Sequence, residues 1–212
     1  MKILRLSVKD EQNIKIEFDN DQILFLSHDI VLKNGLRKND EISEDLFHLL
    51  IVENKKYFIK KKSFSFLSRR AHSAFELKQK LRKKNYNEEL IDQVLEELNE
   101  KKYLNDEGFA AKYVEEKQRL KKVGKNRLKS DLIKKGIHYK IIDKVLNDEF
   151  SETEMLENAF IIASKKYISL SKTESEESII KLKISRYLFS KGYDFETIRD
   201  VIKKILNQDL DY

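Results

Sequence analysis

The chain of 212 residues contains no cysteine, no proline and no tryptophan, and only five glycines. Without cysteine it can form neither disulfides nor thiolate metal sites, and it has no cysteine nucleophile. The lack of cysteine agrees with a reducing compartment, so we expect a cytoplasmic protein. Proline and glycine are the residues that most disfavour a helix interior, and their scarcity favours long, uninterrupted helices.

Long hydrophobic runs are also missing. The longest lies near residues 49–52, whereas roughly 20 apolar residues are needed to cross a bilayer. Met1 and Lys2 are not followed by the apolar core of a signal peptide. We therefore expect a soluble protein that does not bind a membrane.

Motifs for catalysis are absent as well. The four histidines are scattered and none stands in an H-E-x-x-H arrangement, and there is no glycine-rich phosphate-binding loop of the P-loop or dinucleotide type. Most acidic residues fall at capping or helix-surface positions, where solvated charge is the commoner explanation. We expect no enzymatic activity, no metal and no cofactor.

The first 26 residues differ from the rest because apolar and polar positions alternate with the period of a half-buried strand. Polar turns separate two or three such segments, which predicts a hairpin or a three-stranded meander. A short helix should follow with Ser27 as its N-cap and Gly35 just past its end, and Ser43 should cap the next helix. The alternating apolar residues are Leu4, Leu6, Val8, Ile14, Ile16 and Phe18.

An internal repeat appears when the chain is aligned with itself. Residues 77–86 match residues 128–137 at an offset of 51, and a third copy follows at a further offset of 56. In each copy a helix should end at Asn85, Gly136 or Gly192, residue types that tolerate a left-handed backbone. Each copy thus predicts a helix, a turn of about three residues and a second helix.

A further helix precedes each of these pairs. Capping boxes begin at Ser73 and Ser151, and Asp106 is expected to cap another helix. One three-helix unit alone has too small a core, so we expect the units to stack into an elongated, mostly α-helical array. The predicted organisation is an N-terminal β region with short helices at residues 1–59 and three-helix repeats at 60–108, 109–150 and 151–212.

The net charge of +6 is modest, but basic residues gather in two segments. Residues 60–84 hold ten Lys and Arg against one acid and residues 117–135 hold nine against one, whereas residues 85–107 hold eight acids and two lysines. For any single lysine a solvated helix face is the commoner explanation, but for the combined segments we favour a binding surface. The candidate residues are Arg69, Arg70, Lys78, Arg82, Lys83, Lys125, Arg127, Lys129 and Lys134.

Several motifs stand in a fixed order along the chain. The link between the first two repeats reads Tyr-Leu-Asn-Asp-Glu-Gly-Phe-Ala at residues 103–110, residues 66–77 and 124–128 open the first two repeats, and residues 31–38 precede them. Together with the repeated turn, these motifs resemble the bacterial RecX regulatory family, in its longer form with a small β region. The likeness spans nearly the whole chain.

The resemblance implies a protein that binds the RecA recombinase filament, restrains its ATPase and strand-exchange activities in DNA repair and recombination, and can promote its disassembly. We expect the protein to be a monomer. Single- or double-stranded DNA is a further implied partner. Two alternatives remain: a stand-alone DNA-binding protein of the helix-turn-helix kind, and a helical interaction scaffold unrelated to recombination. Five acids on the second helix of the first pair argue against the first alternative, because they would repel phosphates.

Overall fold

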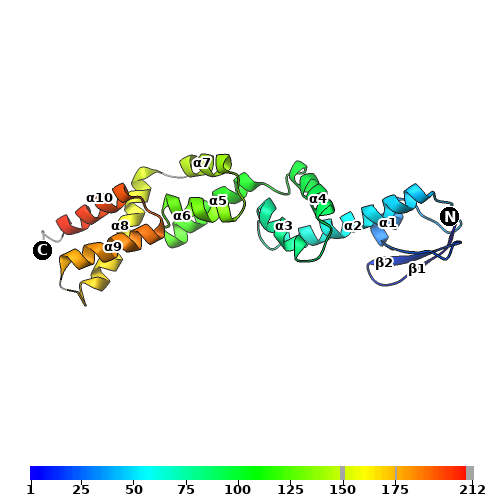
Figure 1. Cartoon of the computed structure of the whole chain (residues 1–212), viewed down its shortest axis with the longest axis horizontal. Helices are drawn as coiled ribbons and strands as arrows, with labels where there is room; N and C mark the ends of the chain where they lie inside the picture. Colours follow the sequence, from blue (N-terminus) through cyan, green and yellow to red (C-terminus); the bar gives the residue numbers. More distant parts are fainter. Residues whose placement is uncertain (149–150, 175, 209–212) are drawn as a thin grey trace. The chain divides into compact units, whose positions relative to one another are not determined.

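The computed structural model describes residues 1–148, 151–174 and 176–208 (Figure 1). The chain falls into two compact units: unit 1 consists of Met1–Ala71 and Leu77–Leu104, and unit 2 of His72–Glu76 and Asn105–Tyr212. The fold is mostly helical, with three groups of three helices that follow a three-stranded antiparallel sheet. The fold class predicted from the sequence is confirmed.

The N-terminal sheet is a meander in which β1 (Ile3–Val8), β2 (Asn13–Phe18) and β3 (Ile23–Ser27) lie in chain order. The alternation predicted for β2 is confirmed, since Ile16 and Phe18 are buried. For β1 the prediction is wrong at Leu4 and Val8, which are 48% and 72% exposed. The register against β2 shifts between Ile3 and Arg5, and this irregularity turns Ile3 rather than Leu4 into the core.

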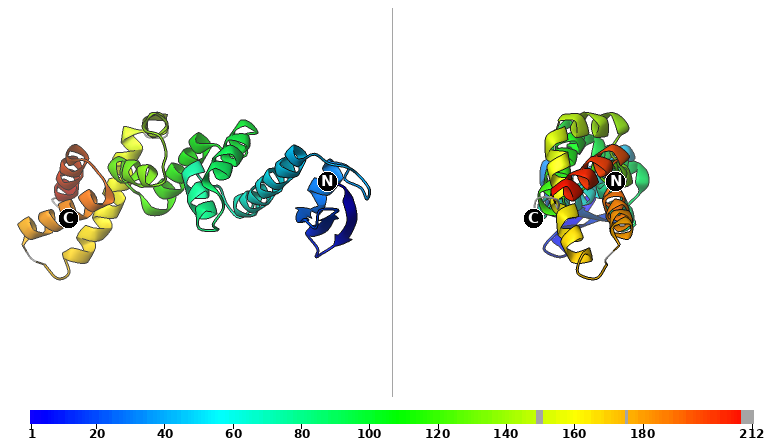
Figure 2. Two further views of the ribbon diagram at one scale, coloured as in Figure 1. Left: turned by 45° about the vertical axis from the view of Figure 1, so that its right-hand side comes forward. Right: turned by 90° about the vertical axis from the view of Figure 1, so that its left-hand side faces the viewer.

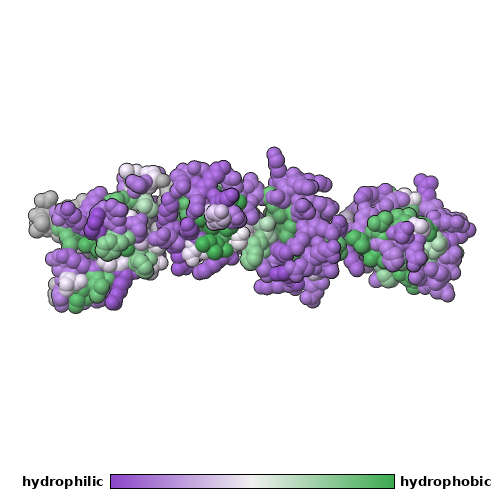
Figure 3. Space-filling view, turned by 45° about the horizontal axis from the view of Figure 1, so that its top comes forward, coloured by the Kyte–Doolittle hydropathy of each residue, from purple (hydrophilic) through white to green (hydrophobic). Residues whose placement is uncertain are grey.

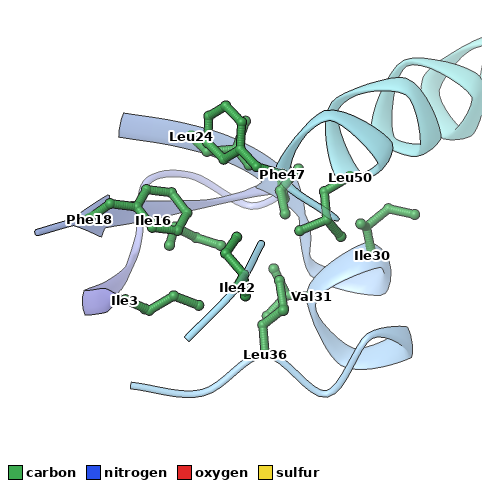
Figure 4. Packing of buried hydrophobic residues seen from close by; sticks show 11 residues of the cluster. Ile3, Ile16, Phe18, Leu24, Ile30, Val31, Leu36, Ile42, Phe47 and Leu50 are labelled. Atoms are coloured by element: carbon green, nitrogen blue, oxygen red, sulfur yellow. The ribbon is translucent and has the colours of Figure 1, made fainter. Parts of the chain in front are cut away.

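The inner face of the sheet is covered by α1 (His28–Lys33) and by the start of α2 (Glu44–Leu67). Ser27 and Ser43 cap these helices, as predicted, because each hydroxyl accepts a hydrogen bond from the backbone N–H three residues later. Phe18 and Phe47 meet edge to face with ring centroids 5.4 Å apart. Figure 4 shows how the strands and both helices contribute to one core, formed by Ile3, Ile16, Phe18, Leu24, Leu26, Ile30, Val31, Leu36, Ile42, Phe47 and Leu50.

The outer edge of β3 is hydrogen-bonded to a side chain of α2. Asn54 Nδ2 donates to the Phe25 carbonyl at 3.0 Å, and its Oδ1 accepts from the Ser27 N–H at 2.8 Å. One amide side chain thus supplies both a donor and an acceptor to the strand, as a neighbouring strand would. It also fixes α2 to the sheet.

α2 is one continuous helix of 24 residues (Figure 2). Its first half packs in the sheet core through Phe47 and Leu50, and its second half packs against α4 (Glu88–Glu100), with Lys60 paired to Glu97. The sequence from residue 44 to 67 has neither glycine nor proline, so nothing in it ends the helix earlier. The boundary expected between residues 59 and 60 therefore falls inside α2.

The remaining helices follow the repeat pattern. Asn85, Gly136 and Gly192 have φ angles of 59°, 74° and 90°, so all three turns use the left-handed region. The apolar pair at the start of each copy is buried, with Leu77 and Leu81 both fully covered. The helices are α3 (Ala74–Arg82), α4, α5 (Asp106–Lys121), α6 (Lys125–Lys134), α7 (Tyr139–Asp148), α8 (Glu152–Leu170), α9 (Glu177–Lys191) and α10 (Phe195–Gln208).

Within unit 2, α8, α9 and α10 pack around one another (Figure 1). The end of α9 is joined to the start of α6 by backbone hydrogen bonds: Gly124 N–H donates to the Lys191 carbonyl at 2.9 Å and Asn126 N–H to the Gly192 carbonyl at 3.1 Å. The buried Tyr193 donates its hydroxyl to the Lys122 carbonyl at 2.8 Å, at the C-terminus of α5. We call these contacts the α6–α9 joint.

The capping role expected for Asp106 is wrong. Asn105 caps α5, because its Oδ1 accepts from the Gly108 N–H at 2.8 Å. The carboxylate of Asp106 accepts instead from the Ala74 N–H at 2.9 Å and so caps the first turn of α3, 32 residues earlier in the chain. Burial raises the pKa of Asp106, an effect that this backbone hydrogen bond partly offsets.

This raised pKa predicts a pH dependence of stability that Asp106→Asn should remove. The unfolded chain loses the Asp106 proton near the ordinary value of 3.8, whereas the folded chain holds it to higher pH. The free energy of unfolding contributed by this residue therefore falls as the pH rises above 3.8. An asparagine oxygen still accepts from Ala74 without ionising.

Urea unfolding of wild type and Asp106→Asn across acidic and neutral pH tests this. As the pH rises above 3.8, the pKa of Asp106 in the unfolded chain, the free energy of unfolding of Asp106→Asn should increase relative to that of wild type. Asp106→Ala is the matched control, which loses the acceptor as well and should be less stable than Asp106→Asn by about 1 kcal/mol. Parallel profiles for wild type and Asp106→Asn would contradict the assignment.

Candidate partner-binding surface

The described residues include no group of His, Asp or Glu side chains that could hold a metal ion. Nor does any helix among them have the length and apolar character needed to span a membrane. The face of the molecule in Figure 3 is mostly hydrophilic, with smaller hydrophobic areas between the charged ones. Charge is therefore the main property that this surface offers to a partner.

In the first repeat, two of the candidate basic residues are held by acids of the next helix. Lys78 Nζ on α3 lies 2.5 Å from Asp92 Oδ1 and 3.6 Å from Glu88 Oε1 on α4. Arg82 also pairs with Glu88. These two side chains brace α3 against α4, and their charges are largely offset where they lie.

The second repeat contains the same arrangement, displaced by 51 residues. Lys129 on α6 lies 3.0 Å from Asp143 on α7, and this pair corresponds residue for residue to Lys78 and Asp92. Arg127 pairs with Asp131 on its own helix at 3.4 Å. Lys125 donates to the Asn147 side-chain oxygen at 3.0 Å. An ion pair between the two helices of the turn motif is thus repeated along with the fold.

Three candidates differ from the rest. Arg69, Lys83 and Lys134 are exposed and form no ion pair within residues 1–148, 151–174 and 176–208. They lie just past the ends of α2 and α3 and at the last residue of α6. Arg70 donates to the Ala71 carbonyl at 2.8 Å. Of the other eight candidates, five are held by an acid or amide side chain, and we call them braced cations; Arg69, Lys83 and Lys134 are the unbraced cations. The basic runs in the sequence do not carry this distinction.

One basic residue that was not among the candidates has a structural role in unit 2. Lys135 Nζ lies 2.6 Å from Glu76 Oε1 and 5.0 Å from the ring centroid of Tyr113. The Tyr113 hydroxyl donates to Asp131 at 3.2 Å, and burial, helped by that carboxylate, raises the pKa of Tyr113 to about 12. Tyr113 therefore stays protonated at physiological pH, and we assign this cluster to packing.

A second basic cluster surrounds a cavity of about 290 Å³ beside the α6–α9 joint. Its cations are Arg127, which was a candidate, and Lys117, Lys121 and Lys191, which were not. Lys117 and Lys121 stand four residues apart and so share one face of α5, a spacing that could have drawn attention to them. No local pattern could have brought Lys191 to them, because it comes from α9.

Comparison with known protein families gives three matches in chain order. Residues 60–98 match the first three-helix domain of RecX, residues 105–146 the second and residues 152–202 the third. The matched segments contain the three turns at Asn85, Gly136 and Gly192. Together they cover more than half of the chain.

Individual relatives match most of the chain or nearly all of it. Regulatory protein RecX of Clostridium botulinum is 31% identical over 210 residues, which cover 97% of each chain. A crystal structure of a regulatory protein RecX has a TM-score of 0.79 at 20% identity and covers 96% of this chain and 98% of its own. That of RecX from Lactobacillus salivarius has a TM-score of 0.66 at 22% identity, covering 72% and 97%. The identities of 20% and 22% to these two crystal structures support the fold alone.

Proposed function

Because the chain belongs to the RecX family of regulatory proteins, we propose that it binds the RecA recombinase filament and restrains ATP hydrolysis and strand exchange by that filament. It would act as a monomer in the cytoplasm, without a cofactor. The observation that carries the proposal is the ordered match of all three repeats. DNA within the filament would be a second contact.

The unbraced cations are the best candidates for the contact with the filament. Arg69, Lys83 and Lys134 can meet a carboxylate or a phosphate without giving up an internal ion pair. The braced cations Lys78, Arg82 and Lys129 would first have to leave theirs. Arginine adds the possibility of a bidentate contact, which makes Arg69 the strongest single candidate.

The alternative of a helix-turn-helix protein that inserts its second helix into a DNA groove is disfavoured. That helix would be α4, whose exposed acids Glu88, Glu89 and Asp92 lie in its first two turns. Approach to a phosphate backbone would bring these like charges together. The scaffold alternative has no observation in its favour and is tested below.

The proposal predicts that reversing the unbraced charges weakens filament binding and leaves the fold intact. Arg69→Glu, Lys83→Glu and Lys134→Glu together should lower affinity for RecA filaments at least about ten-fold, because each lost charge-assisted contact is worth about 1.5 kcal/mol. Inhibition of DNA-stimulated ATP hydrolysis should weaken together with the affinity. Affinity and hydrolysis are measured with the cognate RecA over a range of salt concentrations.

The matched control is Lys38→Glu, Lys55→Glu and Lys172→Glu, which changes the net charge equally at exposed lysines outside the candidate set. It should bind filaments nearly as wild type does. Wild-type protein that leaves hydrolysis unchanged at stoichiometric excess and does not bind filaments would overturn the function. Equal losses for the two triple variants would overturn the assignment of the surface.

A further inference from the structure

Apart from Arg127, the cations around the cavity beside the α6–α9 joint differ from the braced cations, because few acids lie near them. The cavity lining includes four cations and a single carboxylate, that of Asp131. Asp131 is already engaged, since it pairs with Arg127 at 3.4 Å and accepts from the Tyr113 hydroxyl at 3.2 Å. The remaining cations have no counterpart among the lining residues. Such a gathering of like charges favours the arrival of an anion.

Two of the three lysines lie over aromatic rings. Lys117 Nζ lies 5.0 Å from the ring centroid of Tyr113, and Lys191 Nζ lies 5.3 Å from that of Tyr187. These contacts orient an ammonium group and leave its charge available. Lys117, Lys121 and Lys191 form no ion pair in the described part of the chain.

Size and lining limit the kind of ligand. A volume of about 290 Å³ lies near the lower end of small-molecule sites. Val123 is the one apolar residue in the lining, so an apolar or aromatic ligand would find little to pack against. A phosphate monoester carries a charge of about −1.5 to −2 at neutral pH, so more than one phosphoryl group is needed to offset these cations.

The α6–α9 joint fixes the two backbone segments that line the cavity relative to each other. The Gly124 N–H bonds directly to the carbonyl of Lys191, and the Asn126 N–H to the carbonyl of Gly192. The backbones that carry Arg127 and Lys191 are therefore fixed to each other before a ligand arrives. A preorganised site loses little conformational entropy on binding.

We propose that this cavity binds linked phosphoryl groups, with Arg127, Lys117, Lys121 and Lys191 as their ligands. Such groups occur in a free polyphosphate or nucleotide tail and in the backbone of a nucleic acid. The site is distinct from Arg69, Lys83 and Lys134, and it does not depend on RecA. Failure of one proposal therefore leaves the other standing.

The test is calorimetric titration of the full chain, without RecA, with two probes: inorganic tripolyphosphate and a single-stranded oligonucleotide. The variant is Lys117→Gln, Lys121→Gln and Lys191→Gln, which keeps Arg127 and its pair with Asp131. The control is Lys38→Gln, Lys55→Gln and Lys172→Gln, which removes the same amount of charge at exposed lysines that do not line the cavity. Circular dichroism shows whether each variant is folded, and Lys121→Gln alone, at an exposed position, serves if the triple variant is not.

The cavity variant should bind tripolyphosphate at least about ten-fold more weakly than wild type, while the control changes little. Tripolyphosphate should also raise the melting temperature of wild type and not that of the cavity variant. If only the oligonucleotide depends on the three lysines, the phosphoryl groups come from nucleic acid. The proposal is overturned if wild type binds neither probe, or if the control loses as much affinity as the cavity variant.

Discussion

Alanine at Gly192 is expected to destabilise the protein more than alanine at any other glycine of the α6–α9 joint or of unit 1. Gly192 has φ of +90°, and a Cβ there would lie 2.3 Å from the Arg127 backbone nitrogen. The substitution thus combines a left-handed backbone, which costs about 1–2 kcal/mol, with overpacking, which costs about 1–3 kcal/mol. A loss of about 3 kcal/mol should appear in urea unfolding.

Two other glycines separate these effects. At Gly124 the backbone is ordinary, but a Cβ would lie 2.4 Å from the Gly192 carbonyl carbon, so only the overpacking remains. At Gly35 the φ is +61° and nothing lies within 4 Å, so only the backbone strain remains. We expect the loss at Gly192 to exceed each of the other two. Equal losses at Gly192 and Gly35 would show that the close approach is not real.

Truncation of Tyr193 should have an effect of similar size for a different reason. The side chain is 1% exposed and its hydroxyl bonds to the carbonyl of Lys122. Tyr193→Ala removes a buried aromatic ring, a change that typically costs about 3–5 kcal/mol. Tyr193→Phe removes only the hydrogen bond and should cost about 1 kcal/mol.

The equivalent position in the first repeat provides the control. Tyr86 follows the turn at Asn85 as Tyr193 follows Gly192, but it is only partly buried. Tyr86→Ala should therefore destabilise less than Tyr193→Ala when melting temperatures are compared. If Tyr86→Ala lowered the melting temperature more than Tyr193→Ala, Tyr193 would not be the residue that stabilises the third repeat.

Much of the fold could be predicted because its signals are local. The offset of 51 residues, the pairs of leucines and the turn residues each depend on a few neighbouring positions. The failures involve contacts between distant residues. Asp106 stands where an N-cap is expected, yet its hydrogen bond runs to Ala74, and the irregularity that exposes Leu4 depends on pairing with β2.

The candidate surface was less predictable than the fold for the same reason. A run of lysines shows where positive charge lies in the chain, but whether that charge is available depends on a partner from another helix. Lys78 and Asp92 are 14 residues apart, and nothing local distinguishes Lys78 from the unbraced Lys83. The repeat itself held the missing signal: Lys129 and Asp143 stand at the same offset, and pairs that recur together point to contact.

The amide of Asn54 has a consequence for how the protein escapes aggregation. An unpaired strand edge is a template on which a second chain can add a strand, and proteins that cannot cover it risk edge-to-edge association. Here β3 is complete by Ser27, but the side chain that covers its edge comes 27 residues later, on α2. During synthesis the strands therefore leave the ribosome before their cover does. A nascent chain that stalls after Ser27 has left the ribosome and before Asn54 has left it would carry an unpaired β3 edge. Association between stalled chains should be greatest for chains that stall at this stage.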